Sequence, residues 1–451
     1  MKLKLIKCVF GAIVCVVSSV AQAQVNQVSV ILEPPVWAFK ADTVVIPNHE
    51  ARLTPNEQPL AERLKPLLTN ADYHSAASLL EGYKSTTKSA ALWQLTGQVY
   101  LALEQYAKAE EALLIALKQA PGLSRSHRSL AVIYLQLKNY HKAHFHIGQA
   151  IALGHHDAQL FGQLAYINMQ NQQPWAAISG YQRALLLEPN NQQWQQGLMA
   201  SLIQSQQFSA AHALVMDLIA NDENNANLWL RRGQIALNLQ QFEQALSSFE
   251  MALRLGDTQV NNRLLTAQLH IQHGSVARAS TLLKDVLRQD ALQFSQLHPT
   301  FSWLLQQQHY EEAEQLLTTI ADIGTLTVFD QSRYYAFKGQ LAAKNGSIKQ
   351  ALKWYEQSLL LDSNNGEVLL ALAEHFSTQN AYSRAELYYI RAAVIGAVKE
   401  QALLGHAQLE INQQDYASAI VLLNKVLAHN PNRLDLKQNI AILQRLHSQA
   451  S

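Results

Sequence analysis

The sequence predicts an all-α solenoid built of stacked helical hairpins, and two observations lead to that prediction. First, an alanine that closes a Tyr/Phe-x-x-Ala phrase, or a variant of it, recurs at a period of 34 residues. Second, each period contains two sets of apolar residues with the i, i+3, i+4, i+7 spacing of one helix face. A hairpin of this size cannot bury its apolar stripes alone, so a fixed period indicates stacked units. The recurring residues are Ala109, Ala143, Ala177, Ala211, Ala245, Ala279 and Ala313 and, after a slip of four residues, Ala351, Ala385 and Ala419.

The segment 1–23 is predicted to be a cleaved secretory signal peptide. Three lysines, at positions 2, 4 and 7, precede an apolar run over 8–20, and Ala21-Gln22-Ala23 follows. The run is too short to span a bilayer comfortably, and the last three residues have the A-x-A pattern of a cleavage site. An uncleaved membrane anchor is the alternative. We therefore expect an exported protein, periplasmic in a Gram-negative bacterium, that is cleaved after Ala23.

Charge and cysteine content limit what the expected mature chain binds. Both cysteines lie inside the leader, so no disulfide or thiolate ligand would remain after cleavage. Loss of the three lysines leaves 32 Lys and Arg against 34 Asp and Glu, which changes the formal net charge from +1 to about −2. This near balance argues against nucleic acid and anionic lipid as the main ligands. After the leader, no stretch is long and apolar enough to cross a membrane.

A Pro-containing extended lead-in is expected over 24–56, where the repeat is absent. A flexible tether is the simpler interpretation of this segment. The alternative is a docking segment that uses Trp37 and Phe39 to hold a partner or the protein's own binding surface.

The repeats divide the remainder of the chain. An N-terminal array occupies 57–327, with a degenerate first unit, and C-terminal units occupy 332–433. The residues 328–331 hold the break in phase, and we expect a bend or loosened junction there, although a harmless longer loop is the alternative. Pro299 falls in the first helix of the preceding unit, where proline kinks or delays a helix. The segment 434–451 is expected to form a capping helix and tail.

One period, residues 90–123, resembles the tetratricopeptide repeat (TPR). The resemblance implies a right-handed superhelix of about ten to eleven hairpins, in which the first helix of each hairpin lines a concave groove. Its small residues let the two helices approach closely, and its aromatic residues fill the space beside that contact. The residues that carry the resemblance are Trp93, Gly97, Tyr100, Ala109, Leu113, Ala116 and Pro121.

By the same resemblance, the groove is rich in side-chain amides. Five of the ten residues at the ninth position of the regular units are glutamine. Amides donate and accept hydrogen bonds, which suits an extended peptide backbone and also suits sugar hydroxyls. The alternative is that glutamine is simply a good solvated helix former. The predicted partner-binding residues are Gln98, Arg128, Gln163, Tyr166, Gln234, Gln268, Gln340 and Gln408.

Catalytic chemistry is not predicted. The sequence contains no nucleotide-binding, nucleophile-elbow or H-E-x-x-H motif, and no non-repetitive domain that would hold an active site. We predict no catalytic residue, no cofactor and no metal. His141 and His144 have a spacing that would allow a shared metal ion, but ordinary solvated surface histidines are the preferred interpretation.

The sequence therefore predicts a non-enzymatic periplasmic scaffold that binds protein or peptide partners and supports an envelope assembly, such as transport, TonB-type, pilus or secretion machinery. The resemblance supplies these examples only as analogy, because a fold does not determine a function. The alternative is a polysaccharide-binding or polysaccharide-guiding protein of an exopolysaccharide export system. The identity of the partner and the oligomeric state stay open.

Overall fold

The computed structural model describes residues 51–85 and 87–450. Over these residues the chain is helical and has no strand. It separates into two compact units, Met1–Leu255 and Gly256–Ser451, which we call the N-terminal and C-terminal units. The predicted signal peptide and nearly all of the lead-in, including Trp37 and Phe39, lie outside the described residues.

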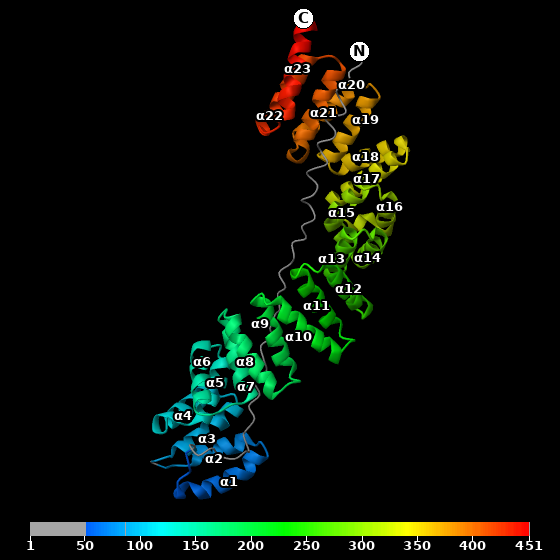
Figure 1. Ribbon diagram of the computed structural model, residues 1–451. Helices are drawn as coiled ribbons and strands as arrows, with labels where there is room; N and C mark the ends of the chain where they lie inside the picture. The colour runs from blue at the N-terminus through cyan, green and yellow to red at the C-terminus, as the bar shows by residue number, and fades with distance from the viewer. Residues whose placement is uncertain (1–50, 86, 451) are drawn as a thin grey trace. The chain divides into compact units, whose positions relative to one another are not determined.

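In the N-terminal unit, consecutive helices pair as antiparallel hairpins that stack in chain order (Figure 1). A 3-10 turn, η3 (Pro55–Glu57), precedes them. The hairpins are α1 (Gln58–Thr69) with α2 (Tyr73–Gly82), α3 (Ala90–Ala102) with α4 (Tyr106–Gln119), α5 (Ser124–Gln136) with α6 (Tyr140–Ala152), α7 (Ala158–Gln170) with α8 (Pro174–Leu187), α9 (Gln192–Gln204) with α10 (Phe208–Asn221), and α11 (Ala226–Asn238) with α12 (Phe242–Arg254).

The C-terminal unit continues the same scheme and ends in a single helix. Three 3-10 turns interrupt its connections: η4 (Ala291–Gln293), η5 (Ile323–Thr325) and η6 (Gly396–Val398). The hairpins are α13 (Val260–Gln272) with α14 (Val276–Gln289), α15 (Phe294–Gln306) with α16 (Tyr310–Thr319), α17 (Val328–Lys344) with α18 (Ile348–Leu361), α19 (Gly366–Thr378) with α20 (Tyr382–Ala393), and α21 (Lys399–Asn412) with α22 (Tyr416–His429), followed by α23 (Leu434–Ala450). The described residues thus form eleven hairpins and a capping helix, which confirms the predicted fold class.

Small residues hold the paired helices together, as the repeat predicts. A Cβ on Gly339 would lie only 2.4 Å from the ring of Tyr355, and one on Gly97 would lie 2.5 Å from Leu113. Ala245 is completely buried. These contacts leave no room for a larger side chain, because helix backbones approach closely where the ridges contain only glycine or alanine.

The turn inside each regular hairpin also repeats. One residue per turn has positive φ, and it recurs in the same phase as the alanine: Glu104 has φ 57°, Lys138 has 55° and Gln172 has 58°. Gly274 and Gly346 occupy the equivalent positions with φ 76° and 77°. This left-handed residue ends the first helix and turns the chain within a few residues. Most repeats accept a small strain here, because glycine is absent at most of the equivalent positions.

The four residues of the phase slip are helical. They form the first turn of α17, so this helix is 17 residues long whereas most first helices have 13. Thr327 caps the turn: its hydroxyl accepts a hydrogen bond from the Asp330 backbone N–H (3.1 Å) and donates one to the Asp330 carboxylate (2.7 Å). Asp330 is 3% exposed. The slip therefore adds a helical turn at 328–331, while the division between the compact units falls at 255/256.

Pro299 does not interrupt its helix either. The helix α15 runs from Phe294 to Gln306 with the proline inside it, directly after η4. At the C-terminal end, α23 is the predicted capping helix, and its Leu436, Ile440 and Leu443 are buried in a cluster with Leu423 and Val426 of α22. No helix among the described residues has the length and apolar character needed to traverse a bilayer.

Candidate functional site

The predicted partner-binding residues all lie on first helices of hairpins. The first helices α3, α5, α7, α9, α11, α17, α19 and α21 each pack against their own partner helix and against the helix before them. In most hairpins the first helix is the more buried of the two: ten of 13 residues of α7 are buried, against four of 14 in α8. The exceptions among the regular hairpins are α11, which has as many buried residues as α12, and α13, which has fewer than α14. The predicted residues are Gln98 on α3, Arg128 on α5, Gln163 and Tyr166 on α7, and Gln234 on α11 in the N-terminal unit, and Gln268 on α13, Gln340 on α17 and Gln408 on α21 in the C-terminal unit.

Two of these residues contribute to packing and present little surface. Gln163 is 1% exposed and Tyr166 is 7% exposed. The Tyr166 ring meets Tyr140 edge-on at 6.3 Å between centroids, and burial, together with Tyr140, raises its pKa to about 12. A partner would reach these side chains only after displacing what covers them.

Some of the expected amides connect neighbouring hairpins. Ser126 donates a hydrogen bond to the Gln94 side-chain oxygen at 2.9 Å, and Arg128 donates one to Gln159 at 3.1 Å. Arg128 also lies 3.6 Å from the Asp157 carboxylate. The two hydrogen bonds join first helices of consecutive hairpins, and the Arg128–Asp157 pair joins α5 to the residue that precedes α7. These groups therefore stabilise the stack. The periodicity alone does not show this, because the partners are about one repeat apart and meet only after stacking.

Other amides remain available. Within the part of the chain that the structure describes, no hydrogen-bond partner is found for the side-chain amides of Gln98, Gln234, Gln268 and Gln340, and all four are half-buried. We call these four residues the open amides. Gln408 differs, because its amide donates to Asn412 on the same helix at 3.0 Å. The open amides can donate and accept hydrogen bonds to a ligand without first breaking internal ones.

The first helices α3, α5, α7, α9 and α11 carry charge of one sign only. Their sequences contain four arginines and no aspartate or glutamate. Arg125 and Arg128 lie on α5, and Arg231 and Arg232 lie on α11. Arg232 stacks on Trp229 at 5.3 Å and donates to the Ser248 hydroxyl at 3.3 Å. Arg231 has no carboxylate partner among the described residues, and burial lowers its pKa. We call these four residues the arginine set.

The histidines of α6 lie in two different environments. His141 and His144 are exposed, whereas His146 is buried and points to α5, where its Nδ1 lies 2.9 Å from Nδ1 of His127. Nε2 of His127 lies 3.2 Å from the Pro121 carbonyl. If His127 donates through Nε2, its Nδ1 accepts the proton of His146, so both rings are neutral. The pair is a packing contact that the sequence reasoning missed.

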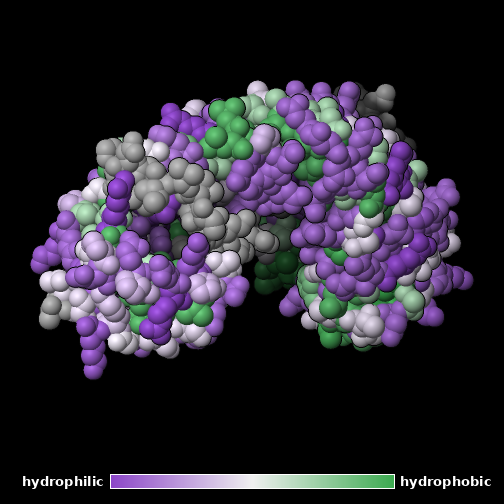
Figure 2. All heavy atoms as spheres, turned by 90° about the horizontal axis from the view of Figure 1, so that it is seen from below, coloured by the Kyte–Doolittle hydropathy of each residue, from purple (hydrophilic) through white to green (hydrophobic). Residues whose placement is uncertain are grey.

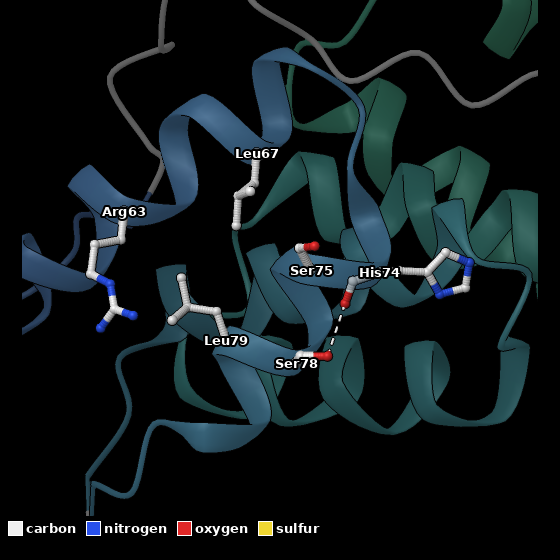
Figure 3. A pocket seen from close by; sticks show the side chains of 6 residues that line it. All are labelled: Arg63, Leu67, His74, Ser75, Ser78 and Leu79. Carbon is white, nitrogen blue, oxygen red and sulfur yellow. Dashed lines mark hydrogen bonds between the residues drawn. The ribbon is translucent and has the colours of Figure 1, made fainter.

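A shallow surface depression of about 600 Å³ lies between α1 and α2. Arg63 and Leu67 of α1 and His74, Ser75, Ser78 and Leu79 of α2 line it (Figure 3). Arg63 and His74 stand at opposite sides of it, and the Ser78 hydroxyl donates to the His74 carbonyl at 3.1 Å. Its polar groups do not converge on a common point, so it lacks the arrangement of an active site.

The face of the molecule drawn in Figure 2 is predominantly polar. Figure 2 shows one face of the molecule, where hydrophilic side chains predominate and hydrophobic ones are interspersed. The most exposed apolar residues, such as Leu186 (81%) and Val394 (83%), lie on or just after different second helices. Scattered exposed leucines and valines are ordinary surface features.

Family comparison agrees with this architecture. Two tetratricopeptide repeat models match the chain: one matches residues 95–150 and 201–260, and the other matches residues 332–365. No curated protein matches the chain. Together with the regular 34-residue hairpins, the family matches show that the chain is a tetratricopeptide repeat protein.

Solved structures of the same fold are similar over parts of the chain. YrrB, a TPR protein with an unusual peptide-binding site, is 16% identical, with 42% of this chain and 92% of that one covered and a TM-score of 0.36. PilF of Pseudomonas aeruginosa is 22% identical, with 49% and 99% covered and a TM-score of 0.35. The TPR domain of P58(IPK) is 15% identical, with 80% and 99% covered and a TM-score of 0.28. The TPR fold suggests a scaffold for protein–protein interaction, and members of the family are generally non-catalytic.

Proposed function

We propose that the protein is an exported, periplasmic and non-enzymatic scaffold that supports an envelope assembly by binding a segment of a partner protein. The N-terminal unit would bind an extended segment that carries acidic side chains. The observation that carries the proposal is the arginine set on helices that have no acidic residue. The location rests on the leader-like sequence at 1–23.

The two kinds of side chain would perform different tasks. Open amides hold a peptide backbone, because each can accept from an N–H and donate to a carbonyl. Arginines select carboxylates, because the guanidinium fork donates two parallel hydrogen bonds to the two oxygens. Arg231 adds to this selection: it is a half-buried cation without an internal carboxylate, so an incoming acidic group would relieve its desolvation.

A capture experiment tests the proposal. Proteins crosslinked to the tagged chain in the periplasm of its own host are identified, and the segment that binds is synthesised as a peptide. Gln98→Ala with Gln234→Ala, and Arg231→Gln separately, are each expected to weaken peptide binding at least tenfold without changing the melting curve. Binding to Arg231 should weaken with added salt, because part of it is Coulombic.

Matched substitutions on second helices serve as controls. Gln149→Ala with Gln182→Ala removes two exposed amides, and Arg254→Gln removes an exposed arginine. These variants should bind like the unaltered protein. If they weaken binding as much as the first-helix variants do, the assigned surface is wrong. If an anionic polysaccharide displaces the captured proteins and itself binds through the same residues, the exopolysaccharide alternative replaces this proposal.

A further inference from the structure

Three metal-ligating side chains meet at the last hairpin junction of the C-terminal unit. His406 and Glu410 lie one turn apart on α21, and Glu386 lies on α20. Nε2 of His406 is 3.1 Å from Oε1 of Glu410 and 3.9 Å from Oε1 of Glu386. One ligand atom from each residue lies within 4.8 Å of the other two. His406 and Glu410 are buried, 8% and 9% exposed, whereas Glu386 is open to solvent.

The orientation of the imidazole is held by packing. Tyr389 of α20 stacks on His406, with ring centroids 6.2 Å apart and planes inclined by 8°. The tyrosine fits because residue 405 is glycine: a Cβ there would lie 2.4 Å from the tyrosine ring. The Tyr389 ring on one face and the 3.1 Å contact with Glu410 both favour the orientation in which Nε2 of His406 faces the carboxylates.

Comparison with an equivalent junction earlier in the chain shows what has changed. Glu110 corresponds to Glu386 in the repeat, and Tyr134 corresponds to Glu410. In each case the later residue follows the earlier one by eight periods of 34 residues plus the slip of four. There the Tyr134 hydroxyl donates to Glu110 at 2.6 Å, and Lys142 lies 3.5 Å from the same oxygen. In the last junction a glutamate replaces the tyrosine donor, so two carboxylates face each other with a histidine between them.

This arrangement leaves negative charge uncompensated. Among the described residues, neither Glu386 nor Glu410 has a Lys or Arg within ion-pair distance, and His406 is their shared partner. The two carboxylates, with oxygens within 4.8 Å of each other, repel, and the burial of Glu410 adds the free-energy cost of removing a charge from water. A divalent cation would remove both penalties, because it neutralises the two carboxylates and binds the imidazole at the same point.

We propose that Glu386, His406 and Glu410 bind a divalent transition-metal ion of the Zn²⁺ type. Tetrahedral Zn²⁺ with ligands at about 2.0–2.2 Å needs donor atoms roughly 3.3–3.6 Å apart, which a rotation of the exposed Glu386 side chain toward His406 would supply. The solvent side leaves the fourth position for water. One imidazole among few oxygens favours Zn²⁺ over Mg²⁺ or Ca²⁺, which require more oxygen ligands. The ion would link α20 to α21 and so tie the last hairpin to the stack.

Zinc titration by calorimetry tests the site. The full chain is used with Cys8→Ser and Cys15→Ser, so that no thiolate competes for the metal. We expect one Zn²⁺ per chain to bind tightly, and Co²⁺ to give the strong visible absorption of a tetrahedral centre. His406→Gln should weaken binding at least tenfold. Glu410→Tyr should do the same while keeping the fold, because it recreates the tyrosine–glutamate pair of Tyr134 and Glu110.

Two further results decide the assignment. His141→Gln with His144→Gln, which removes two exposed histidines elsewhere, should leave the tight site unchanged. Saturating Zn²⁺ should raise the melting temperature of the unaltered chain and leave that of Glu410→Tyr unchanged. Absence of a tight site in the unaltered chain overturns the proposal. So does an affinity that is the same in His406→Gln and Glu410→Tyr as in the unaltered chain.

Discussion

At the residue scale, the hairpins depend on positions where a side chain has no room to grow. Ala245 of α12 is completely buried, and Phe249 one turn later lies 2.9 Å from where a Cβ on Gly233 would stand. Protein interiors are packed as densely as organic crystals, so an added methylene displaces its neighbours. The period of the small residues therefore records the spacing of close backbone contacts.

Ala245→Leu should overpack the α11–α12 hairpin. We expect the free energy of unfolding to fall by about 1–3 kcal/mol, because the larger side chain forces strained rotamers and backbone shifts. Urea denaturation measures the change. Gln244→Leu adds apolar bulk at an exposed position of the same helix and should be nearly neutral. Equal stability of the two variants would contradict the assigned packing.

The buried histidine pair makes stability depend on pH. Burial lowers the pKa of His146 to about 4, with the neighbouring His127 adding to the effect, and burial also lowers the pKa of His127. Above pH 6.5 both states hold neutral imidazoles, so the full stability is present. As pH falls from 6.5 towards 4, the unfolded chain takes up protons that the folded chain does not, so stability is lost.

The loss assigned to His146 is up to about 3 kcal/mol between pH 6.5 and pH 4, because one pKa unit corresponds to roughly 1.4 kcal/mol. His146→Gln should flatten the pH dependence of the urea midpoint over this window. His144→Gln, on the exposed face of the same helix, should leave it unchanged. The same slope in the unaltered chain and in His146→Gln would show that this pair does not control acid stability.

At the element scale, polar side chains stabilise the helix termini. Such a cap lets the four extra residues at 328–331 form the first turn of α17. Thr327 and Asp330 form reciprocal hydrogen bonds at the start of α17. At the N-terminal end of the described chain, Glu57 accepts from the Ser89 hydroxyl at 2.6 Å and from the Ser89 N–H at 2.8 Å. Burial acts to raise the pKa of Glu57, but the hydrogen bonds from Ser89 and Thr54 outweigh it and lower the pKa. A single acidic side chain thus joins η3 to the hairpin that follows α2.

The capping helix α23 protects the apolar face of the last hairpin. Leu436 is 1% exposed in the cluster that it forms with α22. Leu436→Ala should lower stability by about 2–4 kcal/mol through lost burial and the cavity that remains. Leu434→Ala, at a position that is 67% exposed on the same helix, is the matched control and should be nearly silent in thermal melts. A silent Leu436→Ala would mean that α23 is not docked as described.

At the scale of the whole molecule, the chain divides into two compact units, and each contains apolar clusters of its own. One cluster of buried residues runs from Leu60 to Ile235 within the N-terminal unit, and smaller clusters lie between Ala336 and Leu443 of the C-terminal unit. In a solenoid each repeat contacts mainly its neighbours, so stability is a sum of local contributions and a part of the array can fold alone.

Fragments 51–255 and 256–451 should therefore each fold. We expect both to show helical circular dichroism and a cooperative melt, because each retains several complete stacked hairpins. A fragment 51–331, which ends inside the first helix of a hairpin, should gain no stability over fragment 51–327, because it contains only the first turn of α17. An unfolded 256–451 fragment at low temperature would show that this unit depends on the other.

The repeat pattern could not predict several features of the candidate sites, and each has a physical reason. The pattern identifies which helix a residue belongs to, but not whether its side chain is used by a neighbour, and Gln94 is used in this way by Ser126. The Thr-x-x-Asp sequence at 327–330 is the signature of a helix start, and it would have predicted the extra turn of α17. The meeting of Glu386 with His406 and Glu410 required the α20–α21 packing, because the ligands come from two helices.

The sequence by itself determined the hairpin, its 34-residue period and the identity of its close contacts, because small and aromatic residues at helical spacing permit only one way of burying the apolar stripes. Tertiary structure alone decided which polar side chains are used internally and which remain open. That choice depends on distances between residues about one repeat apart, such as Arg128 and Gln159, and on the replacement of a tyrosine donor by Glu410. Side chains on successive hairpins come within hydrogen-bonding distance only after the stack has formed.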